Sequence, residues 1–130
     1  MRQVFEVNTL APLMLTQAFL PLLRKAQSAK IIYTSSDMAS LTDHTYGGSN
    51  AYCISKAGLN MLMRGAAAEF KSDGIIAIAL DLGWVKTDMG GPHAALSPDE
   101  SVRGIIRVVD GLTMQDSGQF WRWDGQHNAW

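Results

Sequence analysis

Tyr52 and Lys56 stand four residues apart in a segment with the composition of a helix. Side chains at that spacing project from the same face of a helix and can meet. A phenol with a pKa near 10 is a poor acid or base at neutral pH, and a neighbouring ammonium stabilises the phenolate and lowers that pKa. The pair therefore predicts a tyrosine that exchanges a proton with a bound substrate. The alternative is a half-buried tyrosine beside a solvated lysine.

The elements around the pair can be predicted from local composition. Lys30–Thr34 is a short β-branched and aromatic run typical of a buried strand, and its end delivers a pair of serines that includes Ser36. The Ser-, Thr- and Gly-rich stretch Asp37–Ser49 indicates a loop long enough to carry function. A second long helix is expected over residues 50–71, with Gly74 closing it.

The rest of the chain continues this alternation of helices and strands. Pro12 and Pro21 each lack a backbone donor, so the first helix should bend or fray around them. The order predicts an α/β fold with a parallel sheet of about three strands and three helices. Four further elements are expected: a helix over residues 3–25, a strand over 75–82, a helix over 97–112 opened by the capping box Ser97-Pro98-Asp99-Glu100, and a strand over 118–124.

Composition excludes several classes of function. With 130 residues, 47% of them hydrophobic, the chain fits one globular domain. A formal net charge of -1 leaves no basic surplus for nucleic acid or an anionic membrane surface, and the apolar stretch Leu10–Leu23 is too short to span a bilayer. The single cysteine, Cys53, fits a reducing cytoplasm, and three scattered histidines predict no metal site.

Four motifs in one order resemble the short-chain dehydrogenase/reductase family, and within it the C-factor (C-signal) and sniffer-type carbonyl reductase branch. The resemblance covers essentially the whole chain. The motifs are the helix segment Phe5-Glu6-Val7-Asn8, the strand ending in Ser35-Ser36, the pair Tyr52 and Lys56 followed by small residues, and the loop Gly83-Trp84-Val85-Lys86-Thr87.

The resemblance implies a role for each matching residue. Tyr52 would act as general acid/base on a small carbonyl or alcohol substrate, and Ser36, or less favourably Ser35, would bind the substrate oxygen. Lys56 would lower the tyrosine pKa and hold the nicotinamide ribose. Asn8 would anchor a water of the proton relay, although it could also be a surface amide.

The same resemblance implies a cofactor and a partner. The cofactor would be NAD or NADP, contacted by the residues Tyr52, Lys56, Gly83, Val85 and Thr87. The family also pairs its two long helices across a dimer axis, so a homo-oligomer through residues 3–25 and 50–71 is expected.

The departures from the family pattern lead to two hypotheses. The turn Gly-x-x-x-Gly-x-Gly, which brings backbone to the cofactor pyrophosphate, has no counterpart here. Leu82 stands where the family has a proline, and Asp81 places a carboxylate at the end of a strand near the expected nicotinamide pocket. The expected fold is therefore the C-terminal half of a Rossmann-like doubly wound sheet, residues 1–130 forming one truncated domain without the N-terminal glycine-rich βαβ unit. The chain is either an oxidoreductase impaired by truncation or a non-catalytic remnant that acts as an interaction or signalling module.

Overall fold

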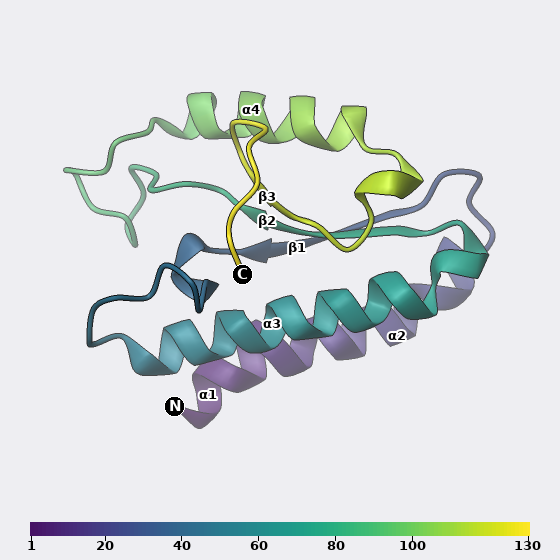
Figure 1. The fold of residues 1–130 in the computed structure, drawn as a ribbon, viewed down its shortest axis with the longest axis horizontal. Coiled ribbons are helices and arrows are strands. Elements are labelled where there is room, and N and C mark those ends of the chain that lie inside the picture. Colours follow the sequence, from purple (N-terminus) through teal and green to yellow (C-terminus); the bar gives the residue numbers. More distant parts are fainter.

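Three parallel strands form a sheet in the order β1-β2-β3, covered by helices on both faces (Figure 1). The computed structural model describes all residues, 1–130. Helices α2 and α3 lie against one face and α4 against the other, which confirms the predicted α/β class. The elements are α1 (Arg2–Phe5), η1 (Glu6–Leu10), α2 (Ala11–Leu23), β1 (Lys30–Ser35), η2 (Asp37–Ala39), α3 (Asn50–Glu69), η3 (Lys71–Asp73), β2 (Ile76–Asp81), α4 (Pro98–Gly111), η4 (Met114–Asp116) and β3 (Phe120–Arg122).

The central strand β2 explains why the sheet forms. All six of its residues are buried, as the nearly continuous apolar sequence predicts for a parallel strand covered on both sides. Alternate side chains face opposite layers: Ala77 and Ala79 join the core under α3, whereas Ile78 and Leu80 join the core under α4. The helices of the two layers therefore pack on opposite faces of the same strand.

The first long helix contains a π-helical turn at η1, between α1 and α2. Pro12, the second residue of α2, has no N–H with which to continue the α-helical hydrogen bonds, so the widened turn stands where the sequence predicts a distortion. Pro21 lies inside α2 without ending it. The π-helical turn includes Asn8, one of the residues singled out by the sequence.

Helix ends are set by side chains and by one glycine. Ser97 and Glu100 form the predicted capping box of α4, with the Ser97 amide donating to Glu100 Oε2 at 2.8 Å and the Glu100 amide donating to Ser97 Oγ at 3.2 Å. After α3, Gly74 adopts a left-handed conformation (φ 69°) that turns the chain into β2. These stops place the carboxyl ends of all three strands at one edge of the sheet.

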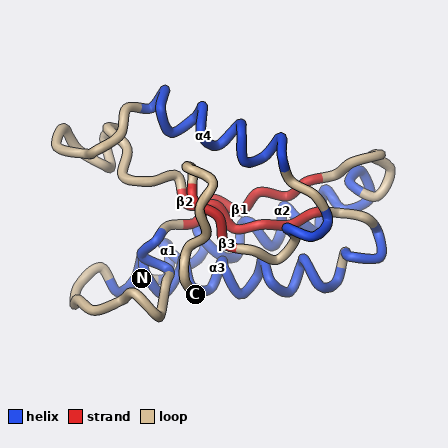
Figure 2. The backbone as a smooth tube through the Cα atoms, turned by 45° about the horizontal axis from the view of Figure 1, so that its top comes forward, coloured by secondary structure: helices blue, strands red, loops and turns tan.

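Loops and helix ends that carry chemistry gather at this carboxyl edge. Figure 2 shows the strands at the centre of the molecule with loops projecting beyond their ends. Strand β3 is shorter than predicted because Gly118 (φ 84°) and Gly125 (φ 87°) mark turns on either side of it.

None of the helices combines the length and the hydropathy needed to cross a bilayer. No group of three or more potential metal ligands occurs in the structure.

Gly104 offers a test of how tightly α4 packs on the last segment. An added Cβ there would lie 2.3 Å from the carbonyl oxygen of Trp123 and 2.7 Å from its ring. We expect Gly104→Ala to lower the free energy of unfolding by about 1–3 kcal/mol through overpacking. Gly65→Ala in α3 is the matched control, because its Cβ meets nothing within 4 Å and should raise stability by about 0.5–1 kcal/mol. Urea denaturation followed by circular dichroism measures both, and equal effects of the two substitutions would contradict the packing described.

Candidate active site

Helix α3 brings Tyr52 and Lys56 to one face, with the lysine Nζ 5.7 Å from the centroid of the tyrosine ring. Lys56 is buried, and its ammonium donates a hydrogen bond of 2.8 Å to the carbonyl oxygen of Thr34 on β1. The carbonyl of Ala29 accepts a hydrogen bond from the Ile76 amide of β2, and successive carbonyls of a strand point to opposite sides. The carbonyl of Thr34, five residues later, therefore points away from β2, at the free edge of the sheet. The lysine therefore fixes the start of α3 to the end of β1.

The pKa of Tyr52 differs in direction from the sequence-based expectation. Burial of the ring is the largest cause and raises the pKa above its ordinary value of 10.0. The neighbouring Ser36 side chain favours the ionised phenol, whereas the negative charges of Asp81 and Asp37 oppose it. Burial also lowers the pKa of Lys56, whose ammonium is turned toward Thr34. The phenol is therefore held in its protonated form, as a proton donor must be.

The two candidate serines have different environments. Ser35 is buried and donates a 2.6 Å hydrogen bond to Asn60 Oδ1 within the core of α3. Ser36 lies beside the Tyr52 phenol, and its Oγ accepts from the Met38 amide at 3.2 Å as the cap of η2. The Ser36 hydroxyl donates to Asp37 Oδ1 at 3.0 Å, an exposed bond between neighbouring residues. Ser36 can therefore bind a molecule that reaches the phenol if this hydroxyl turns away from Asp37, whereas Ser35 is held in the core.

Asn8 reaches α3 from the π-helical turn. Its amide donates to Ser55 Oγ at 3.0 Å, and Ser55 in turn donates to the carbonyl of Tyr52 at 2.7 Å. Asn8 does not contact Lys56 directly, but both line a cavity of about 350 Å³ between α2, β1 and α3. The cavity is wide enough for ordered water between the amide and the ammonium.

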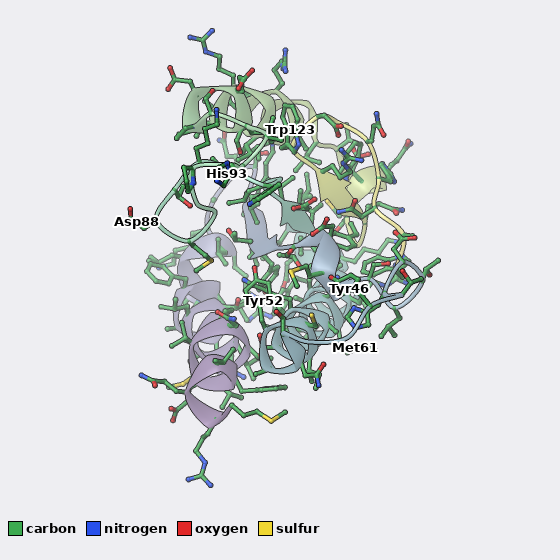
Figure 3. The ribbon with its side chains drawn as sticks, turned by 90° about the vertical axis from the view of Figure 1, so that its left-hand side faces the viewer. Tyr46, Tyr52, Met61, Asp88, His93 and Trp123 are labelled. Atoms are coloured by element: carbon green, nitrogen blue, oxygen red, sulfur yellow. The ribbon has the colours of Figure 1, made fainter.

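The segment between β2 and α4 positions the three expected cofactor-binding residues Gly83, Val85 and Thr87. Gly83 has φ 77°, and a Cβ there would lie 2.5 Å from Leu96, so the position admits only glycine. Val85 pairs with Leu96 in an isolated parallel bridge that closes the segment into a loop. Thr87 is exposed and its Oγ1 accepts from the Gly90 amide at 3.1 Å. Figure 3 shows Asp88 and His93 on this loop, away from Tyr52.

A second cavity, of about 270 Å³, opens at the carboxyl ends of the strands. Asp81, 6% exposed, lies in its wall and accepts hydrogen bonds from the Gly83 amide and the Asn128 side chain. Burial raises the pKa of this carboxyl group. The sequence singled out Asp81 and the neighbouring Gly83-Trp84, but it gave no reason to place Asp37, Trp123 and Asn128 beside them, since those positions depend on tertiary packing.

Comparison with known proteins places the chain in a family. The family model for short chain dehydrogenases matches residues 1–96. The chain belongs to the short-chain dehydrogenase/reductase family. C-signal of Myxococcus xanthus is 42% identical over 130 residues, a match that covers the whole chain and 78% of that protein. A 1-hydroxy-2-glutathionyl-2-methyl-3-butene dehydrogenase of Rhodococcus sp. is 36% identical, and 58% of it is covered.

Solved structures of the family share this fold in about half of their length. Carbonyl reductase Sniffer of D. melanogaster superposes with a TM-score of 0.94 and 36% identity, over 97% of this chain and 55% of that one. A carbonyl reductase from chicken fatty liver, solved with NADPH bound, gives a TM-score of 0.93 and 42% identity over 99% and 56%. The chain thus matches about half of each of these structures, the half that contains the equivalents of its strands β1, β2 and β3.

The electrostatic coupling at the site can be tested through the Tyr52 phenol. We expect Asp81→Asn to lower the pKa of Tyr52, because it removes a negative charge that disfavours the phenolate. Asp110→Asn is the control, since that carboxylate lies near the far end of α4 and does not act on Tyr52. A pH titration of ¹³C-labelled tyrosine by NMR, assigned with Tyr52→Phe, reports the value. A Tyr52 pKa unmoved by Asp81→Asn would contradict the coupling.

Proposed function

We propose that the chain carries the proton-transfer half of an NAD(P)(H)-dependent oxidoreductase that interconverts a small carbonyl compound and a secondary alcohol. The observation that supports this most is the arrangement of three side chains: Tyr52 and Lys56 in the first turns of α3, and Ser36 just after the carboxyl end of β1. Ligands of open parallel sheets bind at this edge. The reductases that resemble the chain give the reaction class, and one of them was solved with NADPH.

In this reaction the Tyr52 hydroxyl gives its proton to the substrate oxygen when a carbonyl is reduced, and takes it back from the alcohol in reverse. Its raised pKa keeps the proton in place until negative charge develops on the substrate oxygen. The Ser36 hydroxyl donates a hydrogen bond to that same oxygen. After transfer, the adjacent ammonium of Lys56 stabilises the phenolate.

Asn8 and the cavity beside it provide a route by which the proton is replaced. A water held between the Asn8 amide and the Lys56 ammonium would connect the site with solvent through the cavity they share. Because Ser55 links the Asn8 side chain to the Tyr52 carbonyl, α3 and the π-helical turn stay in register.

The residues of this chain fit the nicotinamide end of the cofactor. The Lys56 ammonium has three N–H donors and spends one on Thr34, which leaves two for the ribose hydroxyls. Val85 and Thr87 lie on the loop that follows β2 and would hold the nicotinamide. A nicotinamide cofactor bound there supplies the hydride. The sequence offers no glycine-rich turn for the pyrophosphate, so we expect weak binding by these 130 residues and infer no preference between NAD and NADP.

A tyrosine substitution tests the enzymatic proposal. We expect saturable binding of NADPH or NADH at millimolar concentration, and slow NADPH oxidation with a reactive diketone followed at 340 nm. Tyr52→Phe should lower that rate by about 10²–10⁴-fold, because it removes the acid. Tyr46→Phe is the control, an exposed tyrosine in the neighbouring loop (Figure 3). Absence of saturable binding of either cofactor, or a Tyr52→Phe rate equal to the wild-type rate, would overturn the proposal.

A second candidate is an interaction or signalling module. Six apolar side chains of η1 and α2 are about half exposed or more, and β1 is an unpaired edge strand. C-signal, of which the chain covers 78%, is named for a signal. We propose that the exposed faces of η1 and α2 pair with a second copy of this chain in the cytoplasm. Such a dimer is compatible with both candidate functions. The six side chains are Val7, Leu10, Met14, Leu15, Phe19 and Leu22.

Self-association through α2 can be measured with charged substitutions. Met14, 67% exposed, lies on the proposed contact face, so Met14→Glu should shift the chain from dimer toward monomer in sedimentation equilibrium at micromolar concentration. Ile106→Glu is the matched control, because Ile106 on α4 is similarly exposed (52%) on the other side of the sheet. A wild-type monomer, or equal loss of dimer in both variants, would contradict pairing through α2.

A further inference from the structure

The segment after β3 folds back across the carboxyl ends of the strands. It turns at Gly125, pairs antiparallel through His127 and Trp121, and returns along β3 where the Asn128 amide donates to the carbonyl of Phe120 at 2.9 Å. The end of this segment lies between the sheet and α3 (Figure 1). The segment therefore contributes Asn128 to the wall of the cavity at the carboxyl ends of the strands.

Trp130 is anchored by two elements that are distant in sequence. Its ring packs on Phe120 of β3 with 5.6 Å between centroids. The guanidinium of Arg64, on α3, lies 5.3 Å from the centroid of the same ring, and Arg64 is itself held by a 3.0 Å hydrogen bond to the carbonyl of Gly118. Packing and a cation–π contact together fix the position of the tryptophan main chain.

The main-chain oxygen of Trp130 holds the loop that leads from Ser36 to Tyr52. It accepts a 2.7 Å hydrogen bond from the Thr42 amide and a 3.2 Å bond from Ser40 Oγ. The same Ser40 Oγ accepts from the Asp43 amide, and the Ser40 amide donates to the carbonyl of Asp37 at 2.9 Å. These hydrogen bonds connect Trp130, through the Ser40–Asp43 turn, to η2, whose N-cap residue is Ser36.

We propose that Trp130 is a positioning residue, which clamps the Ser40–Asp43 turn and thereby holds η2 and Ser36 against the Tyr52 phenol. The inference rests on the proposed function for its catalytic consequence but not for the clamp itself. Since Trp130 touches the loop and not the reacting atoms, its loss acts through the displacement of Ser36, which hydrogen-bonds the substrate oxygen as negative charge develops there. Within the same segment, Asn128 holds the Asp81 carboxylate, so both walls of the carboxyl-edge cavity depend on this tail.

Hydrogen exchange tests the clamp independently of activity. In Trp130→Ala the Thr42 amide should exchange at least tenfold faster than in the wild type, because the ring that fixes its acceptor is gone, while amides of β2 keep their protection. Trp130→Phe should restore most of the protection by packing on Phe120. Gln126→Ala is the matched control, since its exposed side chain lies in the same tail and makes no hydrogen bond.

The kinetic readout separates this inference from the proposed function. Where turnover is measurable, Trp130→Ala should lower kcat about tenfold or more with a smaller change in KM, because Ser36 acts on the oxygen where charge develops, and Trp130→Phe should recover kcat. Unchanged Thr42 exchange in Trp130→Ala overturns the clamp whatever the activity. Absent cofactor binding with faster Thr42 exchange overturns the proposed function and leaves the clamp standing. If Trp130→Ala does not fold, Arg64→Met, which removes both the cation–π contact and the hydrogen bond to the Gly118 carbonyl, must still speed Thr42 exchange or the clamp is refuted.

Discussion

The hydrogen bond from the Lys56 ammonium to the Thr34 carbonyl is the interaction on which the site depends. A buried ammonium is costly unless it is hydrogen-bonded, and a carbonyl at the free edge of a parallel sheet needs a donor. Each group satisfies the other, so α3 is fixed against the end of β1 where Ser36 begins its turn. Tyr52, one helical turn before Lys56, then has its ring beneath the cation and its hydroxyl beside Ser36.

Burial of the ring is the main reason why the pKa of Tyr52 is raised, although an ammonium as close as that of Lys56 was expected to lower it. Lys56 directs its ammonium to Thr34, and burial of the phenol outweighs the favourable effect of Ser36. The negative charges of Asp81 and Asp37 act in the same direction as burial. The chain by itself therefore presents a proton donor, and the groups that would ionise it must enter with the bound molecules, which also use the remaining donors of Lys56.

Sequence periodicity was sufficient to predict the helices and strands but not the contacts between them. The apolar run of β2 and the capping box at Ser97 are local signals, and both are confirmed in the structure. The spacing of Tyr52 and Lys56 fixed their common face because a helix has one geometry. The environments of Ser35 and Ser36 differ only through Asn60 and Met38, partners whose positions depend on tertiary packing. The tail from Trp123 to Trp130 carried no local signal for its return to the Ser40–Asp43 turn, since that path depends on Arg64 and Phe120, which lie far away in sequence.

The unpaired edge of β1 sets a limit on what these 130 residues can do alone. The edge runs beside the cavity that Asn8 and Lys56 share, and its half-exposed isoleucines lie opposite Leu15 of α2. A strand added at this edge would pair with main-chain groups that point away from β2 and would bury the lysine further. The edge is adjacent to the exposed face proposed for self-association. Because burial already lowers the pKa of Lys56, a molecule that covered this edge would lower that pKa further.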